Sequence, residues 1–308
     1  MSRHAYLILA HSDVPLFTTL VALLDDSRND IFIHIDRSVD SRPFEDAVHH
    51  TVTASEVRFT SHRHRVVWGG FSMVEAELAL LEMAVEEQPY DYIHLLSGVD
   101  LPLMCPDDIH SYFDQRQGTE FVDFWDINEQ LRPEIQARYQ YFDWFQPRAR
   151  NHFARLAYHA VRAFSLGIQR AFRIDREAGY THHPSVGSQM FSITSDLARL
   201  VVSCGPDIRA RFHHTLVPDE AVIQTVVQES PFANRLSAPP GSGPNKTIAR
   251  AIKMPKPHIW HLADVDYLVT SGAVFARKFA SSVDSEAIRS VAAAVRRAQS
   301  GNTDAHED

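Results

Sequence analysis

Short apolar runs that end in polar turns recur along the first third of the chain. Three of them span residues 6–10, 31–35 and 92–96, and two stretches with apolar residues at helical spacing, 14–25 and 72–87, lie between them. Strands that alternate with helices in this way indicate a parallel sheet. The carboxyl ends of such strands meet at one edge, which is where ligands bind in open α/β sheets. The pattern therefore predicts an α/β fold with a site at that edge.

The turn at residues 97–100, Ser-Gly-Val-Asp, follows the third run directly. Gly98 has no side chain, so the backbone there can lie close to a ligand. Taken alone, such a turn is better explained as a cap for the helix that follows. His11 and Asp36 follow the first two runs in the same manner. This repetition favours one shared pocket over three separate caps.

Charge and composition exclude some classes of function. The 308 residues carry a formal net charge of −9, which argues against nucleic acid as a partner, because phosphate binding needs a basic surface. Cys105 and Cys204 are too few for a disulfide framework. No apolar run reaches the roughly 18 residues of a membrane span, and the first strand begins too early to leave room for a signal peptide. We therefore expect a cytoplasmic protein.

Three segments depart from the alternation of strands and helices. Residues 147–176 contain seven arginines and one acid, Asp175, interleaved with apolar residues. This composition is typical of an amphipathic helix on an anionic membrane surface, although a helical insertion with solvated arginines has the same pattern. Residues 235–257 are rich in Pro, Gly and Ser and predict a long loop. Residues 282–298 predict a helix, followed by a polar, disordered tail at 299–308.

An ordered series of seven short motifs runs through the chain. They lie at residues 9–13, 34–38, 67–72, 96–102, 187–191, 217–220 and 276–279. Each is weak alone, but together they resemble the core-2/I-branching N-acetylglucosaminyltransferase and peptide O-xylosyltransferase family. The resemblance implies a nucleotide-diphospho-sugar transferase fold of the GT-A type, a mostly parallel central sheet with flanking helices. It would form one domain, residues 1–280, with 147–176 as an insertion and 281–308 as a C-terminal helix and tail.

The resemblance also implies a reaction. It is that of an inverting, metal-independent glycosyltransferase, which moves a sugar from a UDP-sugar to a hydroxyl of a glycan. We expect UDP-N-acetylglucosamine as the donor, ahead of UDP-xylose and UDP-glucuronate, and no metal or other cofactor. The acceptor would be a glycan or glycolipid in the synthesis of a bacterial surface polysaccharide. Residues 147–176 would then hold the enzyme at the inner face of the membrane as a peripheral protein.

Glu220 is the candidate general base. The Pro-Asp-Glu sequence at residues 218–220 places two acids in the first turn of a helix, where acids are ordinary capping residues. The resemblance matches Glu220 to the general base of the family and leaves Asp219 as the cap. A base that works near neutral pH gains from a raised pKa, which partial burial supplies.

Arg277 and Lys278 are the candidates for neutralising the departing diphosphate. The chain has no Asp-x-Asp metal motif on a core strand turn, since Asp264-Val265-Asp266 falls at the start of a late helix. The resemblance assigns the diphosphate to Lys278 instead, through charge-assisted contacts. An arginine that the family usually carries further upstream is missing here. The residues that could replace it are Lys256, His258, His261 and Arg277.

The other contacts to substrates are assigned by the same resemblance. Asp36 would accept from the uracil N–H, which a carboxylate can do. The full set of donor residues is His11, Asp36, Ser97, Gly98, Asp100, Arg277 and Lys278. Aromatic faces suit sugar stacking, and two aromatic-rich segments, 121–125 and 138–142, lie where the family binds its acceptor. The acceptor residues that we name are Asp123, Arg138, Tyr139 and Gln189.

Two other classes of function are open on the sequence alone. Histidines and aspartates at strand ends suit the two-metal site of a hydrolase. The residues of that cluster would be His11, Asp13, His34, Asp36, His94 and Asp100. Alternatively, the missing arginine could leave a non-catalytic module that binds carbohydrate or nucleotide.

Overall fold

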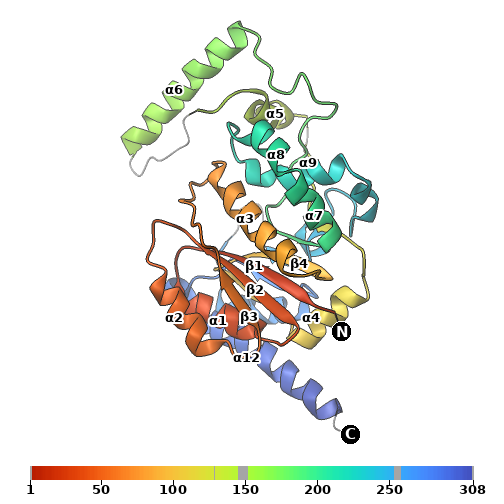
Figure 1. Ribbon diagram of the computed structural model, residues 1–308. Coiled ribbons are helices and arrows are strands. Elements are labelled where there is room, and N and C mark those ends of the chain that lie inside the picture. Colours follow the sequence, from red (N-terminus) through yellow and green to blue (C-terminus); the bar gives the residue numbers. More distant parts are fainter. Residues whose placement is uncertain (1, 128, 145–151, 253–257, 307–308) are drawn as a thin grey trace.

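The computed structural model describes residues 2–127, 129–144, 152–252 and 258–306. A six-stranded sheet in the order β3-β2-β1-β4-β7-β6 forms its centre (Figure 1). The strands are β1 (His4–Ala10), β2 (Asn29–Ile35), β3 (Glu56–Phe59), β4 (Tyr92–Ser97), β6 (Phe121–Val122) and β7 (Phe191–Ile193). The first four strands in the chain pair in parallel, whereas β7 runs antiparallel to both β4 and β6. The predicted α/β class with a mostly parallel sheet is confirmed.

Helices cover both faces of this sheet, as parallel strands require. One face carries α1 (Val14–Leu24), α2 (Arg42–Thr51), α4 (Pro106–Asp114) and α12 (Ser281–His306), and the other carries α3 (Ser72–Glu87), α7 (Ser195–Ser203), α8 (Gly205–Phe212) and α9 (Val222–Gln228). The apolar periodicity predicted α3 with both of its ends and α1 to within one residue. The two helix layers bury β1, β2 and β4 almost completely.

A second, three-stranded sheet pairs the strand that follows the turn after β4 with two strands from residues 250–277. Its order is β5-β9-β8, formed by β5 (Asp100–Pro102), β9 (Phe275–Arg277) and β8 (Arg250–Ile252). The long loop predicted at residues 235–257 is therefore wrong in part, because it contains α10 (Pro244–Thr247) and β8. The apolar residues around Arg250 pair with β9, and this long-range pairing overrides the local Pro and Gly signals.

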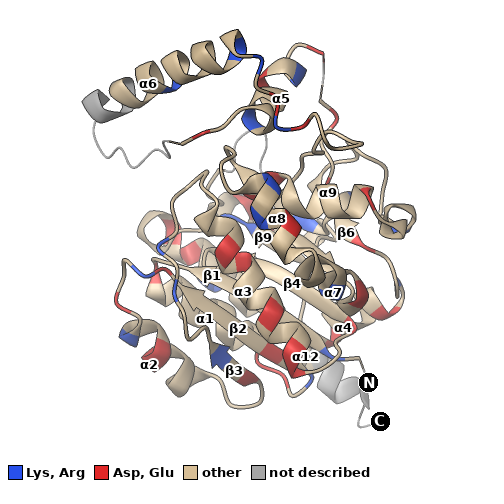
Figure 2. Ribbon diagram, turned by 45° about the horizontal axis from the view of Figure 1, so that its top comes forward, with Lys and Arg blue, Asp and Glu red and all other residues tan. Residues whose placement is uncertain are grey.

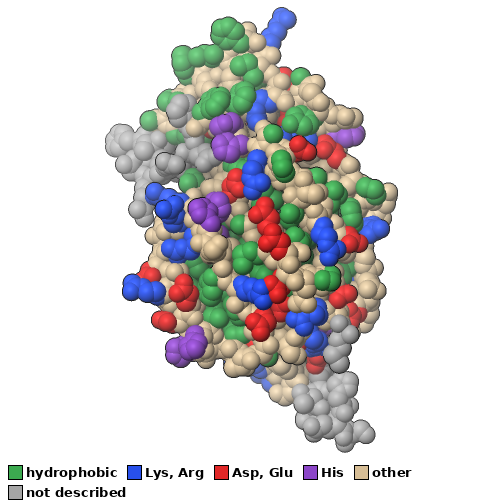
Figure 3. All heavy atoms as spheres, in the orientation of Figure 1, with side chains coloured by type: hydrophobic (Ala, Val, Ile, Leu, Met, Phe, Trp, Pro, Cys, Tyr) green, Lys and Arg blue, Asp and Glu red, His purple; other side chains and the backbone are tan. Residues whose placement is uncertain are grey.

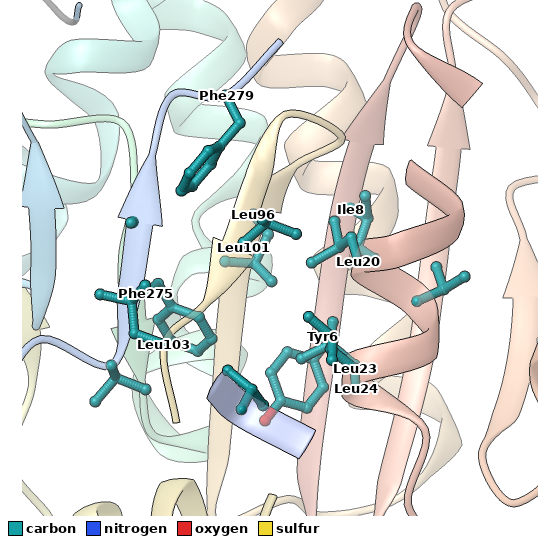
Figure 4. Close-up of a cluster of buried hydrophobic side chains, with 14 of the residues drawn as sticks. Tyr6, Ile8, Leu20, Leu23, Leu24, Leu96, Leu101, Leu103, Phe275 and Phe279 are labelled. Atoms are coloured by element: carbon teal, nitrogen blue, oxygen red, sulfur yellow. The ribbon is translucent and has the colours of Figure 1, made fainter. Parts of the chain in front are cut away.

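The core on the α1 face links both sheets (Figure 4). Side chains from β1, α1, the β4–β5 region and β9 meet there, and each is 8% exposed or less. They include Tyr6, Ile8, Leu20, Leu23, Leu24, Leu96, Leu101, Leu103, Phe275 and Phe279. Burying a side chain of this size stabilises the folded state by about 1.5–3 kcal/mol. The segment that carries Arg277 and Lys278 is thus anchored by Phe275 on one side and Phe279 on the other.

The remaining helices lie toward one end of the molecule or near the C-terminus. They are α5 (Arg132–Gln140), α6 (His152–Ala171), α11 (Val265–Thr270) and the 3-10 turns η1 (Pro218–Glu220), η2 (Pro231–Arg235) and η3 (Leu262–Asp264). Figure 1 shows α6 projecting from the body of the protein. It supplies the helix expected within residues 147–176, of which 147–151 lie outside the described residues. In the described part of the chain, we find no helix both long and apolar enough to cross a bilayer.

The last helix is longer than the sequence predicts. α12 continues to His306, through positions 299–306 for which the polar composition predicts a disordered tail. Buried residues such as Val291 and Val295 anchor the first part of the helix. Once a helix is nucleated, each further residue adds one backbone hydrogen bond without a new nucleation cost.

Three histidines are buried together between the central sheet and α4. His94 hydrogen-bonds His4 over 3.2 Å, and His4 stacks on His110 with 4.0 Å between ring centroids. The Ser192 hydroxyl hydrogen-bonds His94 Nδ1 at 2.8 Å, and Asn29 Oδ1 hydrogen-bonds His110 Nε2 at 2.9 Å. Burial lowers the pKa of all three histidines, that of His110 to about 4. The cluster is therefore a neutral, structural one.

This cluster should make the fold sensitive to acid. Each histidine titrates near 6.5 when unfolded and well below that when folded, so the unfolded chain binds more protons as the pH falls below about 6.5. Stability should drop there by up to about 1.4 kcal/mol per pH unit for each histidine. Urea unfolding between pH 8 and pH 5 measures the slope. His110→Gln should make it shallower, whereas His49→Gln at an exposed position on α2 should not; equal slopes for both variants would contradict this account.

Candidate active site

A cavity of about 940 Å³ opens at the carboxyl ends of β1, β2 and β4. Four of the predicted donor residues line it from these strand ends, namely His11, Asp36, Ser97 and Gly98. The end of β9 and the residue after it add Arg277 and Lys278 to the wall of the cavity. Six of the seven donor residues that we predicted therefore surround one cavity. Its position agrees with the sheet edge that the alternation of strands and helices indicated.

Gly98 allows two strand ends to approach each other below the cavity. A Cβ atom at this position would lie 2.9 Å from the Cβ of Ala10, closer than ordinary side-chain contacts allow. The Gly98 N–H donates to Leu9 O over 2.9 Å, which holds the turn against β1. The glycine thus serves the close packing of β1 and β4, which in turn shapes the wall of the cavity.

Asp36 organises the loop on the β2 side of the cavity. Its Oδ1 accepts from the backbone N–H and the hydroxyl of Ser38, at 2.7 and 2.6 Å, and its Oδ2 accepts from the Val66 N–H at 2.8 Å. Although burial opposes the effect, these hydrogen bonds hold the pKa of Asp36 below its usual value. The side chain is ionised at neutral pH, and Oδ2 can still accept one further hydrogen bond.

Asp100 does not line the cavity, and in this respect the sequence-based assignment is wrong. Its side chain is fully buried, where it accepts from the Ser97 hydroxyl at 2.9 Å and from Arg277 Nη1 at 3.0 Å. Arg250 Nη1 lies 3.7 Å from its other oxygen. A buried carboxylate needs such partners, because an unpaired charge is costly in the interior. Asp100 therefore holds Arg277 at the cavity instead of contacting a ligand.

Arg250 belongs to this group although the sequence analysis missed it. It is fully buried, and its Nη2 donates to the Leu95 carbonyl at 2.6 Å and to the Phe191 carbonyl at 3.3 Å. Burial lowers its pKa to about 10, which still leaves it charged at neutral pH. The detectable signal was a lone arginine inside an apolar run, residues 248–252.

Lys278 lies beside Arg277 in the cavity wall. Its backbone carbonyl accepts from the Trp260 N–H at 3.0 Å, which fixes the chain at that point. Among the residues that the structure describes, no carboxylate forms an ion pair with the Lys278 ammonium. Of the four candidates for the second basic residue, Lys256 lies outside the described residues and His261 pairs with Asp284 at 3.5 Å. Arg277 is the candidate that lines the cavity.

Glu220 lies beside a second acid, Asp219, and an arginine, Arg138. Its Oε2 is 3.3 Å from Nη1 of Arg138, on α5, and its side chain is 26% exposed. Burial and the neighbouring Asp219 raise the pKa of Glu220 to about 7, although Arg138 opposes them. A carboxylate with this pKa can accept a proton from a hydroxyl near neutral pH. Arg138, which we assigned to the acceptor, holds the Glu220 carboxylate in the structure.

Two loops connect Glu220 to the cavity. The Gly187 N–H donates to the Glu220 carbonyl at 2.8 Å, and Gln189, two residues later, lines the cavity. The Val217 N–H donates to the Gly69 carbonyl at 2.8 Å, and the adjacent Trp68 also lines the cavity, with 72% of its surface exposed. Glu220 therefore lies next to the side of the cavity that Trp68 and Gln189 form.

Two of the predicted acceptor residues have structural positions instead. Asp123 is 4% exposed, and its two oxygens accept from the Thr247 hydroxyl at 2.7 Å and the Trp125 indole at 2.9 Å. Tyr139 is 1% exposed, and its hydroxyl donates to the Val217 carbonyl at 3.3 Å. Tyr139 thus packs beneath the loop that carries Glu220, whereas Trp125 in the other aromatic segment stays 37% exposed.

Four residues of the hydrolase alternative, His11, Asp13, His34 and Asp36, line the cavity, but their side chains do not converge on one point. His94 is in the buried histidine cluster, Asp100 pairs with arginines, and His34 Nε2 accepts from the His64 N–H at 2.8 Å. Asp13 caps α1 and accepts from the Ser281 N–H at 2.7 Å. Within the described residues, no group of three or more His, Cys, Asp or Glu side chains could hold a metal ion.

Comparison with known proteins identifies the family to which the chain is similar. The model of the Core-2/I-Branching enzyme family matches residues 4–239. A search of curated proteins found no match. Among solved structures, the apo form of mouse xyloside xylosyltransferase 1 is similar at 10% identity and a TM-score of 0.34, over 75% of this chain and 83% of that one. S. aureus TarS 1-349 in complex with UDP-GlcNAc is similar at 9% identity and a TM-score of 0.28, over 41% of this chain and 36% of that one.

The assignment rests on the family model, because it spans most of the chain and includes the strand-end turns and Glu220. The resemblance that the seven motifs indicated is thereby confirmed. This protein belongs to the Core-2/I-Branching enzyme family and is a glycosyltransferase.

Proposed function

We propose that the protein transfers a sugar from a UDP-sugar to a hydroxyl of a glycan acceptor, with inversion and without a metal. The observation that carries the proposal is the pairing of a cationic cavity wall, Arg277 and Lys278, with a carboxylate, Glu220, whose pKa is raised to about 7. UDP-N-acetylglucosamine is the donor that we favour, and UDP-xylose and UDP-glucuronate are alternatives. The uracil N–H would donate to Oδ2 of Asp36, which has room for one more hydrogen bond.

The reaction is a single displacement. The acceptor hydroxyl gives its proton to Glu220 as its oxygen attacks the anomeric carbon. The bond from that carbon to the β-phosphate oxygen breaks, and UDP leaves with the electron pair. Lys278 and Arg277 stabilise the negative charge that develops on the diphosphate, and such preorganised charges lower a barrier by several kcal/mol. One displacement inverts the configuration of the anomeric carbon.

Removal of the base tests the assignment of Glu220. Glu220→Gln keeps the shape of the side chain but cannot accept the proton, so turnover should fall by on the order of a hundredfold or more. Binding of UDP should be unchanged. In the wild type, turnover should rise with pH through about 7, because the ionised form of Glu220 is the active one. Initial rates from pH 5 to pH 9 measure both effects; near-wild-type turnover of Glu220→Gln would remove Glu220 from the mechanism.

Removal of the cation tests the leaving-group assignment. Lys278→Ala should weaken UDP binding by roughly ten- to hundredfold, the loss expected for a charged hydrogen bond, and should leave uridine binding unchanged. Lys246→Ala, at a position away from the cavity, is the matched control. Calorimetric titration of both ligands decides the matter, since equal losses of affinity for UDP and uridine would place Lys278 away from the diphosphate.

Transfer by the wild type should persist in excess EDTA, because the proposed reaction uses no metal. Loss of activity that Mn²⁺ or Mg²⁺ restores would revive the metal-dependent alternative.

We further propose that the enzyme works at a membrane surface that it contacts through α6. The inner side of this helix is held to the body, since Arg162 Nε donates to Asp143 Oδ2 at 2.7 Å and Gln169 binds the backbone of Phe142. The outer side carries an apolar stripe at helical spacing. Its members and their exposed fractions are Val161 (43%), Phe164 (72%), Ile168 (42%) and Phe172 (77%). Figure 3 shows hydrophobic side chains gathered at this end of the molecule.

The charge around the stripe suits an anionic lipid surface. The sequence contains no acid between Asp143 and Asp175, whereas Arg170 and Arg173 are exposed near the end of α6. Figure 2 shows basic but no acidic residues along the helix. An apolar face with basic flanks is the pattern of helices that lie in the membrane interface. An enzyme held there could reach a glycolipid acceptor.

Co-sedimentation with vesicles tests the membrane contact. The wild type should bind vesicles that contain phosphatidylglycerol more strongly than pure phosphatidylcholine, and salt should weaken the binding. Phe164→Ser combined with Phe172→Ser should abolish it, while Val283→Ser, at an apolar position on α12 that is 50% exposed, should not. Failure of the wild type to bind either kind of vesicle would contradict the proposal. Loss of a dimer in the double variant would assign the stripe to a second copy of the chain.

A further inference from the structure

Glu77 is a buried acid that the proposed reaction does not use. It lies on the core-facing side of α3, between the buried Val74 and Leu81, and is 2% exposed. A carboxyl group in such surroundings is costly unless a polar partner compensates for the lost water. Burial and the nearby Asp219 raise the pKa of Glu77 well above its ordinary value. An apolar residue would fill this position in an ordinary amphipathic helix, so the acid calls for a specific explanation.

The polar partner of Glu77 is Gln189, a residue of the cavity wall. Gln189 Nε2 donates to Glu77 Oε1. The two residues before Gln189 are held by hydrogen bonds, because the Gly187 N–H donates to the Glu220 carbonyl and Gln224 Nε2 donates to the Ser188 carbonyl at 2.8 Å. Gly187 also cannot be replaced, since a Cβ there would lie 1.8 Å from the Asp123 carbonyl oxygen. Backbone and side chain of Gln189 are thus both held in place.

The contact with Glu77 decides which end of the amide is offered to a ligand. A glutamine amide has a donor end and an acceptor end, and a free side chain can present either one. With the nitrogen held at Glu77, the carbonyl oxygen is the end available to the cavity. That oxygen accepts hydrogen bonds and cannot donate one. It would therefore attract an amide N–H or a hydroxyl and disfavour a carboxylate.

We propose that Glu77 is a positioning residue for donor recognition, which fixes the Gln189 amide so that its carbonyl oxygen accepts a hydrogen bond from the transferred sugar. The inference rests on the proposed function, because it requires a UDP-sugar in the cavity. It places the discrimination between sugars at Gln189, on the side of the cavity next to Glu220. The nucleotide is recognised elsewhere, at Asp36, Arg277 and Lys278. A sugar with an acetamido or hydroxyl donor at this point fits the site better than one with a carboxylate.

A double-mutant cycle tests this role. Glu77→Met fills the same space without a polar group, and Gln189→Met removes the amide. Each should weaken binding of UDP-N-acetylglucosamine about tenfold, the loss of one hydrogen bond of a good donor to its acceptor, and leave binding of UDP unchanged. The two changes together should weaken it no more than either does alone, because Glu77 acts only through Gln189. Glu77→Gln still offers a carbonyl oxygen to Gln189 and should retain most of the binding.

Stability measurements separate positioning from a structural role. Glu77→Met should raise the midpoint of thermal unfolding or leave it unchanged, since it removes a buried carboxyl from an apolar helix face. Glu86→Met, at an exposed position of the same helix, is the matched control for binding. Additive losses of UDP-sugar affinity from the two substitutions, or equal weakening of UDP and UDP-sugar binding, would overturn the role of Glu77. Either result would leave the proposed function intact. If the wild type binds none of the UDP-sugars, the proposed function fails and this inference fails with it.

Discussion

The arrangement of the active site depends on one buried carboxylate. Asp100, on β5, accepts hydrogen bonds from Ser97 and Arg277 and lies near Arg250, so it joins the end of β4 to the other two strands of the second sheet, β9 and β8. These strands come from parts of the chain that are more than 150 residues apart from β4 in sequence. Among the described residues, Asp100 is the carboxylate beside both arginines, so its loss would leave the buried Arg250 without an acidic partner. The segment that bears Lys278 would lose its attachment to the strand ends.

A second balance of charges sets the pKa of Glu220, the proposed base. Glu77, Asp219 and Glu220 are three carboxyl groups in one region, and Arg138 opposes the rise in pKa of Asp219 and Glu220. Burial raises the pKa of Asp219 to about 6, and its Oδ1 has no hydrogen-bond partner among the described residues. This surplus of acid favours protonation, whereas the ion pair with Arg138 favours the carboxylate. The pKa of Glu220 near 7 is the outcome of that competition, and it places the base in the range where it can both accept and release a proton.

The sequence predicts the parts of this structure that depend on local periodicity. The core strands, α1, α3 and the strand-end turns with Gly98 follow from apolar patterns that neighbouring residues set. β8 was missed because its pairing with β9 is formed over a long distance in sequence. Arg250 and Glu77 were missed for a related reason: each is a charged residue at an apolar position, and its meaning depends on a partner that only the fold brings near. Asp123 was misassigned because aromatic packing and sugar stacking use the same residue types.

The position of Arg250 helps to explain how the site can lack the upstream arginine that the family usually carries. The alternative of a non-catalytic module rests on Ile259, Trp260 and His261 standing where an arginine is expected. Asp100, however, is near two arginines, and one negative charge cannot neutralise both. Arg250 is wholly buried and points its Nη2 at backbone carbonyls, whereas Arg277 reaches the cavity with part of its side chain exposed. Asp100 pairs with Arg277 at 3.0 Å and lies 3.7 Å from Arg250, so the three side chains together keep one surplus positive charge. With Lys278 in the same lining, this surplus makes the wall cationic, as the proposed contact with a diphosphate leaving group needs.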